Sequence, residues 1–283
     1  MNDAFVSMTA IILAICAFAL VFYYVAQISW YYMETYRNFS IQEQKDWCAR
    51  INSTLHACLI VPCMLFAFFH QRWDAEYMPL RSTRISNIFF AISCGYFIFD
   101  LSILLRWKMT LWKVFVAHHL IAMFPYLVYL FSNNCDIDLY LLTLFLLVEF
   151  AVVPLNITTI LEKLSYEGSM LHTCSFYATY TAWFLSRVLL PSYNMYILWD
   201  VVLLGRREVN FCILPAAVCG HLISAFCIGV FFFVWTPEVI KKCRKSARGP
   251  NAMVHLSESP KVLSASELSS YGTIPEALDK ILV

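Results

Sequence analysis

Long apolar runs alternate with short polar segments along most of the chain. A run of about 20 apolar residues is long enough to cross the hydrocarbon core of a membrane as a helix. Such runs recur at residues 4–33, 51–69, 85–105, 111–131, 137–161, 172–198 and 211–235. The breaks between them carry turn or charge signals, such as the Ser132-Asn133-Asn134 segment. The pattern predicts an all-α, polytopic membrane helix bundle of about seven spans.

The distribution of basic residues predicts the orientation of this bundle. With seven spans, five Lys and Arg residues fall on the side of the N-terminus and twelve on the side of the C-terminus. Cytosolic loops carry the excess of positive charge in membrane proteins. We therefore expect the C-terminus to be cytosolic and the N-terminus to be lumenal or extracellular.

Composition supports a membrane protein and excludes several other classes. Hydrophobic residues make up 60% of the 283 residues and charged residues only 14%, whereas soluble chains carry about 25% charged residues. The net charge of +1 gives no electrostatic basis for nucleic-acid binding. Most of the eleven cysteines lie in apolar runs, which indicates small hydrophobic side chains rather than a secreted disulfide framework.

Polar residues inside the predicted spans are the main indication of function. An ionisable side chain there is unfavourable by about 2.5–3.5 kcal/mol on insertion scales. His56, Asp100, His118, His119 and Asn156 lie on four different spans, five to eight residues from the cytosolic end of each. Such groups are stabilised by facing one another. We therefore expect the bundle to enclose an intramembrane cavity at this depth.

A second polar layer is predicted nearer to mid-span. It consists of Glu149, Arg187 and His221. Glu149 and Arg187 can form a buried ion pair that fixes helix packing, or they can contact a ligand directly. Pro154, Pro191 and Pro215 each remove a helical hydrogen bond, so we expect kinks nearby.

Adjacent helical residues point about 100° apart, so His118 and His119 cannot both face the cavity, and the sequence does not distinguish them. One of them can be functional, with Asp100 bonded to a ring, or both can be structural. Seven histidines with one adjacent pair are too few for the clustered repeats of a membrane di-iron site, so we expect no metal. Nucleophile-elbow, phosphate-loop and paired CxxC motifs are absent from the sequence.

Five segments resemble the TLC domain family, in order and over some 200 residues. They are KDWCARINSTLHACLIVP, AISCGYFIFDLSILL, VFVAHHLIAMFPY, the segment around Glu149, Pro154 and Asn156, and the segment around Arg187 and Pro191. The first two carry Trp47, Arg50, Ser53, His56, Gly95, Tyr96 and Asp100. The chain is most similar to the small TLC domain-containing proteins, notably the protein 4 subgroup. Ceramide synthases and translocation-associated membrane proteins are more distant relatives.

The resemblance implies three regions and a role in lipid biology. We expect a first helix and loop at 1–44, a TLC domain of six helices at 45–245 and a disordered cytosolic tail at 246–283. The family implies a lipid-sized cavity and work on lipids in the endoplasmic reticulum or plasma membrane. Ceramide synthases use the histidine pair to transfer an acyl chain from coenzyme A. This chain has Leu141, Leu142 and Phe145 where they carry a further Asp, so it departs from their pattern.

Three hypotheses follow. The first is a lipid-homeostasis protein that binds an acyl lipid through a cavity formed by His56, Asn156, Glu149, Arg187 and His221, without a cofactor, and influences phospholipid composition or fluidity. The second is an acyltransferase with His118, His119 and Asp100 as catalytic residues and acyl-CoA as cosubstrate. The third is a cargo adaptor that uses the loops and the tail. Membrane lipid is the expected partner, and the sequence does not indicate an oligomeric state.

Overall fold

A computed structural model of the chain describes residues 3–75, 77–80, 84–132, 135–203 and 213–247. These residues are almost entirely helical, and Trp73 and Pro79 form an isolated β-bridge. The predicted tail lies, from residue 248 onward, outside the described residues. The helical segments are α1 (Asp3–Tyr32), α2 (Glu34–Arg37), α3 (Ile41–His70), α4 (Arg84–Trp107), α5 (Trp112–Phe131), η1 (Asp136–Asp138), α6 (Leu139–Leu146), η2 (Leu147–Ala151), α7 (Val152–Lys163), α8 (Met170–Trp183), η3 (Phe184–Leu189), α9 (Leu190–Leu203), α10 (Ile213–Val230), η4 (Phe231–Trp235) and α11 (Thr236–Ala247).

The chain divides into a compact unit from Met1 to Cys227 and a second unit from Ile228 to Val283. The first unit holds α1 to α9 and most of α10. The second begins in the last turn of α10 and includes η4 and α11, which carries an ion pair between Lys241 Nζ and Glu238 Oε1 at 3.8 Å. All the contacts described below lie within the first unit.

Six helices in the described part of the chain are long and apolar enough to cross a membrane. They are Asp3–Tyr32, Ile41–His70, Arg84–Trp107, Trp112–Phe131, Leu139–Lys163 and Ile213–Arg244. The predicted all-α polytopic fold is therefore confirmed, and the protein is an integral membrane protein. The span predicted at 172–198 is also a continuous helix, built from α8, η3 and α9 with 14, 6 and 14 residues. This helix is more polar than the other six, so it is long enough but not apolar enough to be placed with them by composition.

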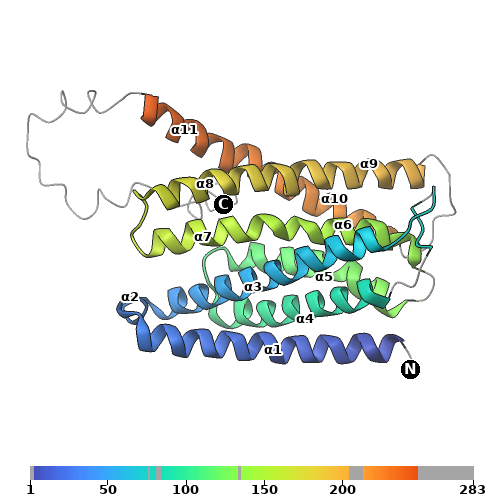
Figure 1. Ribbon diagram of the computed structural model, residues 1–283, viewed down its shortest axis with the longest axis horizontal. Helices are drawn as coiled ribbons and strands as arrows, with labels where there is room; N and C mark the ends of the chain where they lie inside the picture. Colours follow the sequence, from blue (N-terminus) through green and yellow to red (C-terminus); the bar gives the residue numbers. More distant parts are fainter. Residues whose placement is uncertain (1–2, 76, 81–83, 133–134, 204–212, 248–283) are drawn as a thin grey trace, which may run out of the picture. The chain divides into compact units, whose positions relative to one another are not determined.

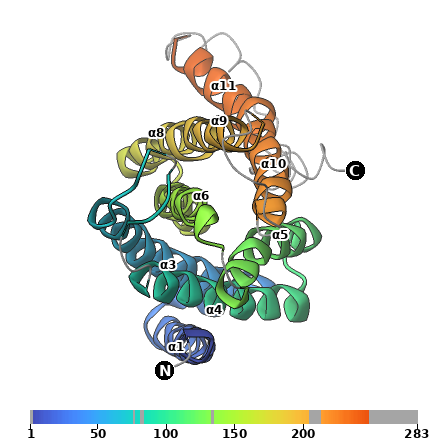
Figure 2. The same ribbon diagram turned by 90° about the vertical axis from the view of Figure 1, so that its right-hand side faces the viewer.

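Figure 1 shows the long helices of the first unit side by side, and Figure 2 shows them end on. The helix formed by α8, η3 and α9 runs antiparallel to the one formed by α6, η2 and α7, because α8 packs on α7 and α9 packs on α6. It extends along the whole neighbouring span. The chain thus has seven long helices in its described part, six of them strongly apolar.

The second long helix, α3, starts ten residues before the predicted span. Its first residue is Ile41, and Ser40 caps it: the Glu43 backbone N–H donates to Ser40 Oγ at 3.3 Å, and the Ser40 N–H donates to Glu43 Oε2 at 2.8 Å. This reciprocal capping box satisfies two backbone donors at the start of the helix. The charged residues that hydropathy assigned to a loop therefore belong to the first turns of α3.

The first helix packs closely on α4 through Gly95. A Cβ atom at Gly95 would lie 2.6 Å from Ala14 Cβ and 2.7 Å from the Ile11 carbonyl oxygen. Only a residue without a side chain fits there, since real Cβ atoms do not approach other atoms so closely. Hydrogen bonds also tie α1 to α3: Asn52 Nδ2 donates to the Phe18 carbonyl at 3.0 Å, and Trp47 Nε1 donates to Ser29 Oγ at 3.1 Å.

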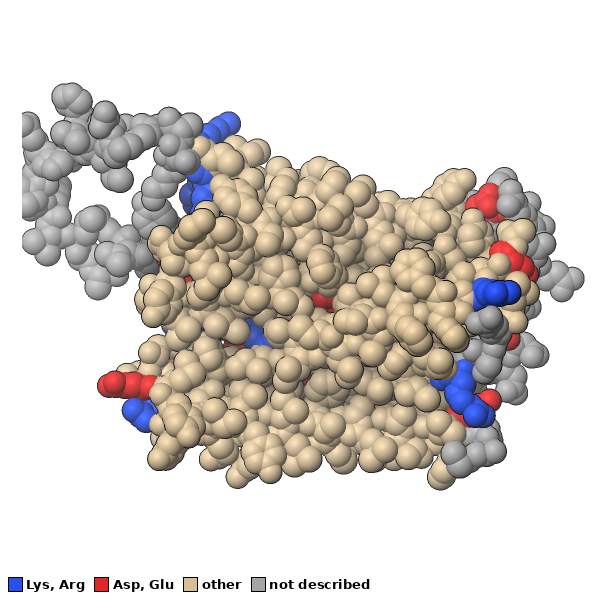
Figure 3. All heavy atoms as spheres, viewed as in Figure 1, with Lys and Arg blue, Asp and Glu red and all other residues tan. Residues whose placement is uncertain are grey.

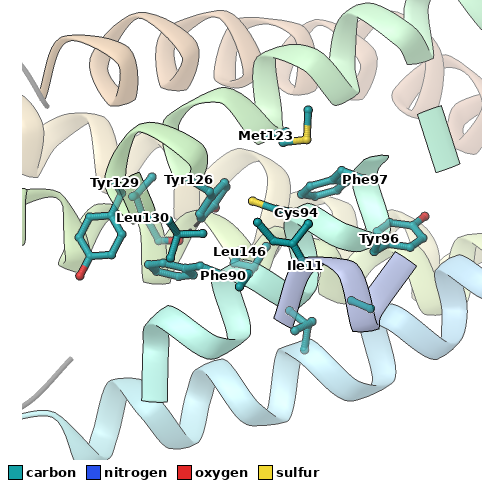
Figure 4. Packing of buried hydrophobic residues seen from close by; sticks show 14 of the residues in the cluster. Ile11, Phe90, Cys94, Tyr96, Phe97, Met123, Tyr126, Tyr129, Leu130 and Leu146 are labelled. Carbon is teal, nitrogen blue, oxygen red and sulfur yellow. Dashed lines mark hydrogen bonds between the residues drawn. The ribbon is translucent and has the colours of Figure 1, made fainter. Parts of the chain in front are cut away.

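The largest hydrophobic cluster in the described part of the chain joins α1, α3, α4, α5 and α6, with Ala216 of α10 (Figure 4). Phe90 is fully buried and makes edge-to-face contacts with Tyr126 and Tyr129, at ring-centroid distances of 5.1 and 5.5 Å. Aromatic pairs in this geometry contribute about 0.5–1.5 kcal/mol each beyond area burial. This cluster holds α4 and α5 rigidly beside each other, and both helices carry site residues.

Two spans depart from α-helical geometry next to two of the three prolines at which kinks were predicted. The 3₁₀ segment η2 ends three residues before Pro154, and the π-helical segment η3 ends two residues before Pro191. Each proline lacks a backbone N–H, so the preceding turn loses a hydrogen bond and can tighten or widen. Pro215 lies near the start of the described part of α10. Glu149 lies on η2 and Arg187 on η3, so both irregular segments carry a charged residue.

Charged side chains of the first unit lie mainly near the ends of its helices on the face seen in Figure 3, and an uncharged band lies between them. A blue and a red patch appear in a hollow within this band. An uncharged band of this kind suits the hydrocarbon core of a bilayer. The described cysteines are free except for Cys135, which is disulfide-bonded. Cys94, Cys219 and Cys227 are buried as predicted, whereas Cys16 and Cys58 are exposed on the outer helix faces.

Candidate functional site

Four of the polar residues predicted inside the bundle, Asp100, His119, Glu149 and Arg187, form a cluster centred on His119 and Asp100. His119 Nε2 on α5 lies 2.9 Å from Asp100 Oδ2 on α4, and both side chains are buried. The other ring nitrogen, Nδ1, lies 2.7 Å from the Phe115 carbonyl oxygen one turn earlier. Both nitrogens of His119 are therefore occupied.

These two contacts determine the number of protons in the pair. A carbonyl oxygen can only accept, so Nδ1 of His119 must carry a hydrogen. A neutral imidazole then has a bare Nε2, which would repel the lone pairs of an ionised Asp100. A hydrogen bond at 2.9 Å thus requires one further proton between Nε2 and Oδ2. The Asp100–His119 pair holds this proton and is neutral as a whole.

A second pair of opposite charges lies beside the first. Arg187 Nη2 lies 3.9 Å from Glu149 Oε1, both side chains are buried, and Arg187 Nε donates to the Val148 carbonyl at 3.3 Å. The guanidinium also lies over the Trp183 ring, 4.7 Å from its centroid. Glu149 is close enough to interact electrostatically with Asp100 and His119. The two pairs thus form one charge-compensated cluster.

His118 is the histidine that faces a pocket. Its ring lines a space between α4, α5, α6, η2 and α10, together with Glu149. Its Nδ1 is buried and has no hydrogen-bond partner within the described chain. The neighbouring rings of His119 and Phe226 lie 5.6 and 6.1 Å away between centroids. His118 is therefore free to bond a ligand, whereas His119 is not.

The pocket is narrow and mostly apolar. Its volume is about 40 Å³, and about 10–15 Å³ by this measure holds one water molecule. Phe97, Tyr126 and Leu146, all labelled in Figure 4, form three of its walls. The Tyr126 hydroxyl does not serve the pocket, because it donates to the Leu142 carbonyl at 3.1 Å. The described residues do not show the lipid-sized cavity that we expected.

His56 lies next to this cluster but outside the pocket. Its Nε2 lies 3.2 Å from Ser93 Oγ, and its ring stacks on Tyr96 with centroids 4.0 Å apart. Phe97 separates it from His119, at centroid distances of 5.8 and 5.7 Å. The ring is fully buried, and its Nδ1 finds no partner in the described chain. His56 therefore packs behind the pocket wall.

Asn156 joins two helices instead of facing the pocket. Its Nδ2 lies within hydrogen-bond distance of the Arg50 carbonyl, Ser53 Oγ and Thr54 Oγ1, at 3.0, 2.7 and 3.0 Å. Arg50 Nη1 donates to its Oδ1 at 3.3 Å, and Asp46 Oδ2 accepts from Arg50 Nε at 2.8 Å. The contacts of Asn156 that join α3 to α7 were not predicted from the sequence.

His221 lies apart from the other predicted residues. It is exposed on α10, accepts a hydrogen bond from Trp199 Nε1 at 2.9 Å, and has its Nδ1 2.7 Å from the Ala217 carbonyl. Both of its ring nitrogens are used on the outer surface between α9 and α10. A long apolar span shows how far along the helix a residue lies, but not to which side of the helix its side chain points. The sequence therefore could not distinguish the outward-facing His221 from the inward-facing histidine.

The arrangement offers a ligand one unpartnered imidazole nitrogen and one carboxylate in an apolar pocket. Within the residues that the structure describes, no group of three or more His, Cys, Asp or Glu side chains could hold a metal ion. In the two ionic pairs beside the pocket, each charge is compensated by its partner. The available chemistry is hydrogen bonding and proton exchange through His118, with Glu149 as a second polar contact.

Comparison with known proteins gives one family. A family model described as the TLC domain matches residues 46–240. TLC domain-containing protein 4 of Homo sapiens is 32% identical over 123 residues, which are 41% of this chain and 44% of that protein. TLC domain-containing protein 4-B of Danio rerio is 25% identical over 208 residues, 72% of this chain and 76% of its own. No solved structure matches.

The matched region contains the whole cluster, from Asp100 to Arg187, and also His56 beside it. The predicted resemblance is confirmed both for the domain and for the relatives of the protein 4 subgroup. The human relative is matched over less than half of its length. The chain belongs to the TLC domain family.

Proposed function

We propose that this integral membrane protein acts in lipid homeostasis: it binds an acyl lipid at the His118 pocket and thereby influences the phospholipid composition or fluidity of its membrane. One observation carries the proposal. His118 lines an apolar pocket on the candidate membrane span α5, and its buried Nδ1 has no hydrogen-bond partner within the described chain. Leaving such a group without a partner costs about 1–3 kcal/mol, so a ligand that supplies a hydrogen bond is stabilised there.

The surrounding pairs would keep this group available. Asp100 and the Phe115 carbonyl hold both nitrogens of His119, which fixes the ring beside His118. Glu149 and Arg187 compensate each other, so no uncompensated charge competes for the ligand. In this proposal Asp100, His119, Glu149 and Arg187 position His118. The lipid contacts only His118 and Glu149.

We assign the protein to the endoplasmic reticulum, with the plasma membrane as the alternative, and we place its C-terminus in the cytosol. The twelve-to-five distribution of basic residues supports this orientation. The disulfide at Cys135 supports it independently, because this residue lies on the side predicted to be lumenal or extracellular. Disulfides persist in such oxidising compartments and are rare in the cytosol.

Rescue of cells that lack the protein tests the proposal. His118→Asn keeps a polar side chain but removes the imidazole. We expect this variant to insert and accumulate normally. The lipid that co-purifies with the wild type in mass spectrometry should be missing, and the phospholipid acyl profile of the cells should stay uncorrected. His221→Asn is the matched control and should rescue fully, because His221 lies outside the cluster. Full rescue by the double His118→Asn/His119→Asn variant would overturn the proposal.

A second candidate is an acyl-CoA-dependent acyltransferase of the ceramide-synthase type. The Asp100–His119 hydrogen bond favours it, since a carboxylate that orients an imidazole is common in acyl transfer. Because His119 has no free nitrogen, His118 would be the base. It would take the acceptor proton as the new bond to the acyl carbon forms and the C–S bond breaks, and the coenzyme A thiolate would then receive that proton. Turnover of acyl-CoA by the purified protein, absent in His118→Asn, would establish this function over the first.

A further inference from the structure

An apolar groove lies on the outer side of α5, next to the His118 pocket. Its walls are Leu120, Ile121, Met123, Phe124 and Leu127 of α5, and Cys219 of α10. Its volume is about 300 Å³, several times that of the pocket. Leu120 and Phe124 are about half exposed, so the groove opens toward the surrounding lipid. It offers an apolar chain a site at membrane depth.

The groove and the pocket share two walls. Ile121 and Cys219 line both spaces, so these side chains form the partition between them. The α10 side of the partition is thin, because Cys219 is followed by Gly220. A Cβ atom at Gly220 would lie 2.9 Å from Phe145 Cζ on α6, so α10 sits close against the inner wall. A small movement of Ile121 would connect the groove with His118.

The unequal volumes indicate how an amphiphile would divide between the two spaces. A pocket of about 40 Å³ holds as much as a few water molecules, which suits a head of a few heavy atoms and excludes a phosphodiester head. The groove has room for a chain, and its walls contain no charged or hydroxyl group. The chain therefore belongs in the groove and the head in the pocket.

The charges around the pocket restrict the chemistry of the head. No Lys or Arg lines it, whereas the Glu149 carboxylate does. An anionic head would thus meet a carboxylate and no unpaired cation, because Arg187 is bound to Glu149 and to the Val148 carbonyl. A head that donates a hydrogen bond finds an acceptor in the Glu149 carboxylate, and the unpartnered Nδ1 of His118 accepts a second such bond when the ring carries its hydrogen on Nε2.

We infer that the ligand is a single-chain amphiphile with a small, uncharged, hydrogen-bond-donating head, such as a long-chain alcohol. Its chain lies along α5 in the groove, and its head passes between Ile121 and Cys219 to reach His118 and Glu149. This inference rests on the proposed function for its pocket, and it replaces the acyl lipid of that proposal with a single-chain lipid alcohol as the ligand. It adds the ligand class and the route from the bilayer.

Photo-crosslinking of the full chain in lipid nanodiscs tests the inference. The probe is a long-chain alcohol with a diazirine at mid-chain and a terminal alkyne. We expect it to label peptides that contain Leu120 to Leu127 or Cys219. An excess of unlabelled long-chain alcohol should reduce labelling at least fivefold, whereas phosphatidylcholine should not. Labelling elsewhere, or equal competition by phosphatidylcholine, would overturn the inference.

Variants of the partition give a second, independent readout. Ile121→Trp fills the passage and should reduce labelling at least fivefold. Leu222→Trp is the matched control: Leu222 is 53% exposed on α10 and lines neither space, so labelling should persist. Cys219→Leu thickens the partition from α10 and replaces Ile121→Trp if that variant does not accumulate. Unchanged labelling in the partition variants would also overturn the inference.

The proposed function is tested separately by the lipid that co-purifies with the protein. If this lipid is lost in His118→Asn while the alcohol probe does not label the groove, the inference fails and the proposed function stands. If no lipid co-purifies and the probe labels neither α5 nor α10, both fail.

Discussion

Replacement of Asp100 tests the shared proton in the buried pair. In Asp100→Asn, the amide nitrogen can take the place of Oδ2 and donate to a neutral His119 Nε2, while Nδ1 keeps its bond to Phe115. One hydrogen bond is retained but loses its ionic character. Since bonds to charged groups contribute about 1.5–3 kcal/mol and neutral ones about 0.5–1.5, the loss should be about 1 kcal/mol.

Asp100→Leu should be worse, because it leaves Nε2 buried without any partner. That costs about 1–3 kcal/mol in addition to the lost bond. We therefore expect unfolding temperatures in mild detergent to fall in the order wild type, Asp100→Asn, Asp100→Leu. The control is Asp136→Asn, at an exposed carboxylate, which should leave the unfolding temperature unchanged.

Two outcomes would refute the reasoning. If Asp100→Asn unfolds as early as Asp100→Leu, the proton is not arranged as described. If Asp100→Leu is as stable as the wild type, the pair reaches water and no buried group is left unpartnered. Nitrogen chemical shifts of His119 provide a direct check, because Asp100→Asn should give a neutral ring protonated at Nδ1.

Three further predictions follow from the charges. Glu149→Ala or Arg187→Ala should lower protein abundance, because an uncompensated buried charge costs about 3–5 kcal/mol. The charge-swapped double variant should recover part of the lost abundance. Equal abundance of all variants would mean that both groups reach water. A tag at the C-terminus should be open to protease from the cytosol and one at the N-terminus should not; protection of the C-terminal tag in sealed vesicles would reverse the orientation. Burial raises the pKa of Asp138 from 3.8 to about 7. Between these two pH values the folded protein keeps a proton that the unfolded chain releases, so the free energy of unfolding falls as the pH rises toward 7. Asp138→Asn should flatten the fall in stability between about pH 4 and pH 7, and a profile that the substitution does not change would contradict this.

Much of the fold could be predicted from hydropathy, since membrane spans must satisfy their backbone internally and be apolar. Helix ends were harder. The start of α3 is set by the capping box of Ser40 and Glu43, a local signal that a search for apolar runs overlooks. The helix from α8 to α9 is held by polar contacts, such as Thr158 Oγ1 with Ser175 Oγ at 2.8 Å, so its hydropathy understates its place in the bundle.

Depth along the spans brought together the residues of the cluster, because buried polar groups must find one another. Depth could not show to which side of its helix each side chain points. Asn156 and His221 lie at suitable depths, yet one joins α3 to α7 and the other is on the outer surface. The choice of His118 over His119 depends on the contacts with Asp100 and Phe115 that occupy both nitrogens of His119, and on the pocket that His118 lines. Such contacts require coordinates.

The close contact at Gly95 has a consequence for biosynthesis. Helix α1 contributes few polar groups of its own, but its inner face is complete only when α4 has arrived. Synthesis proceeds at about 5–20 residues per second, so the end of α4 at Trp107 follows the end of α1 at Tyr32 by about 4–15 s. During this interval α1 lies in the bilayer without α4, and its hydrogen bonds with Asn52 and Trp47 can form only as α3 is synthesised. A nascent chain stalled before α4 would therefore expose the surface that Gly95 later covers, which makes this segment a natural point for quality control to act.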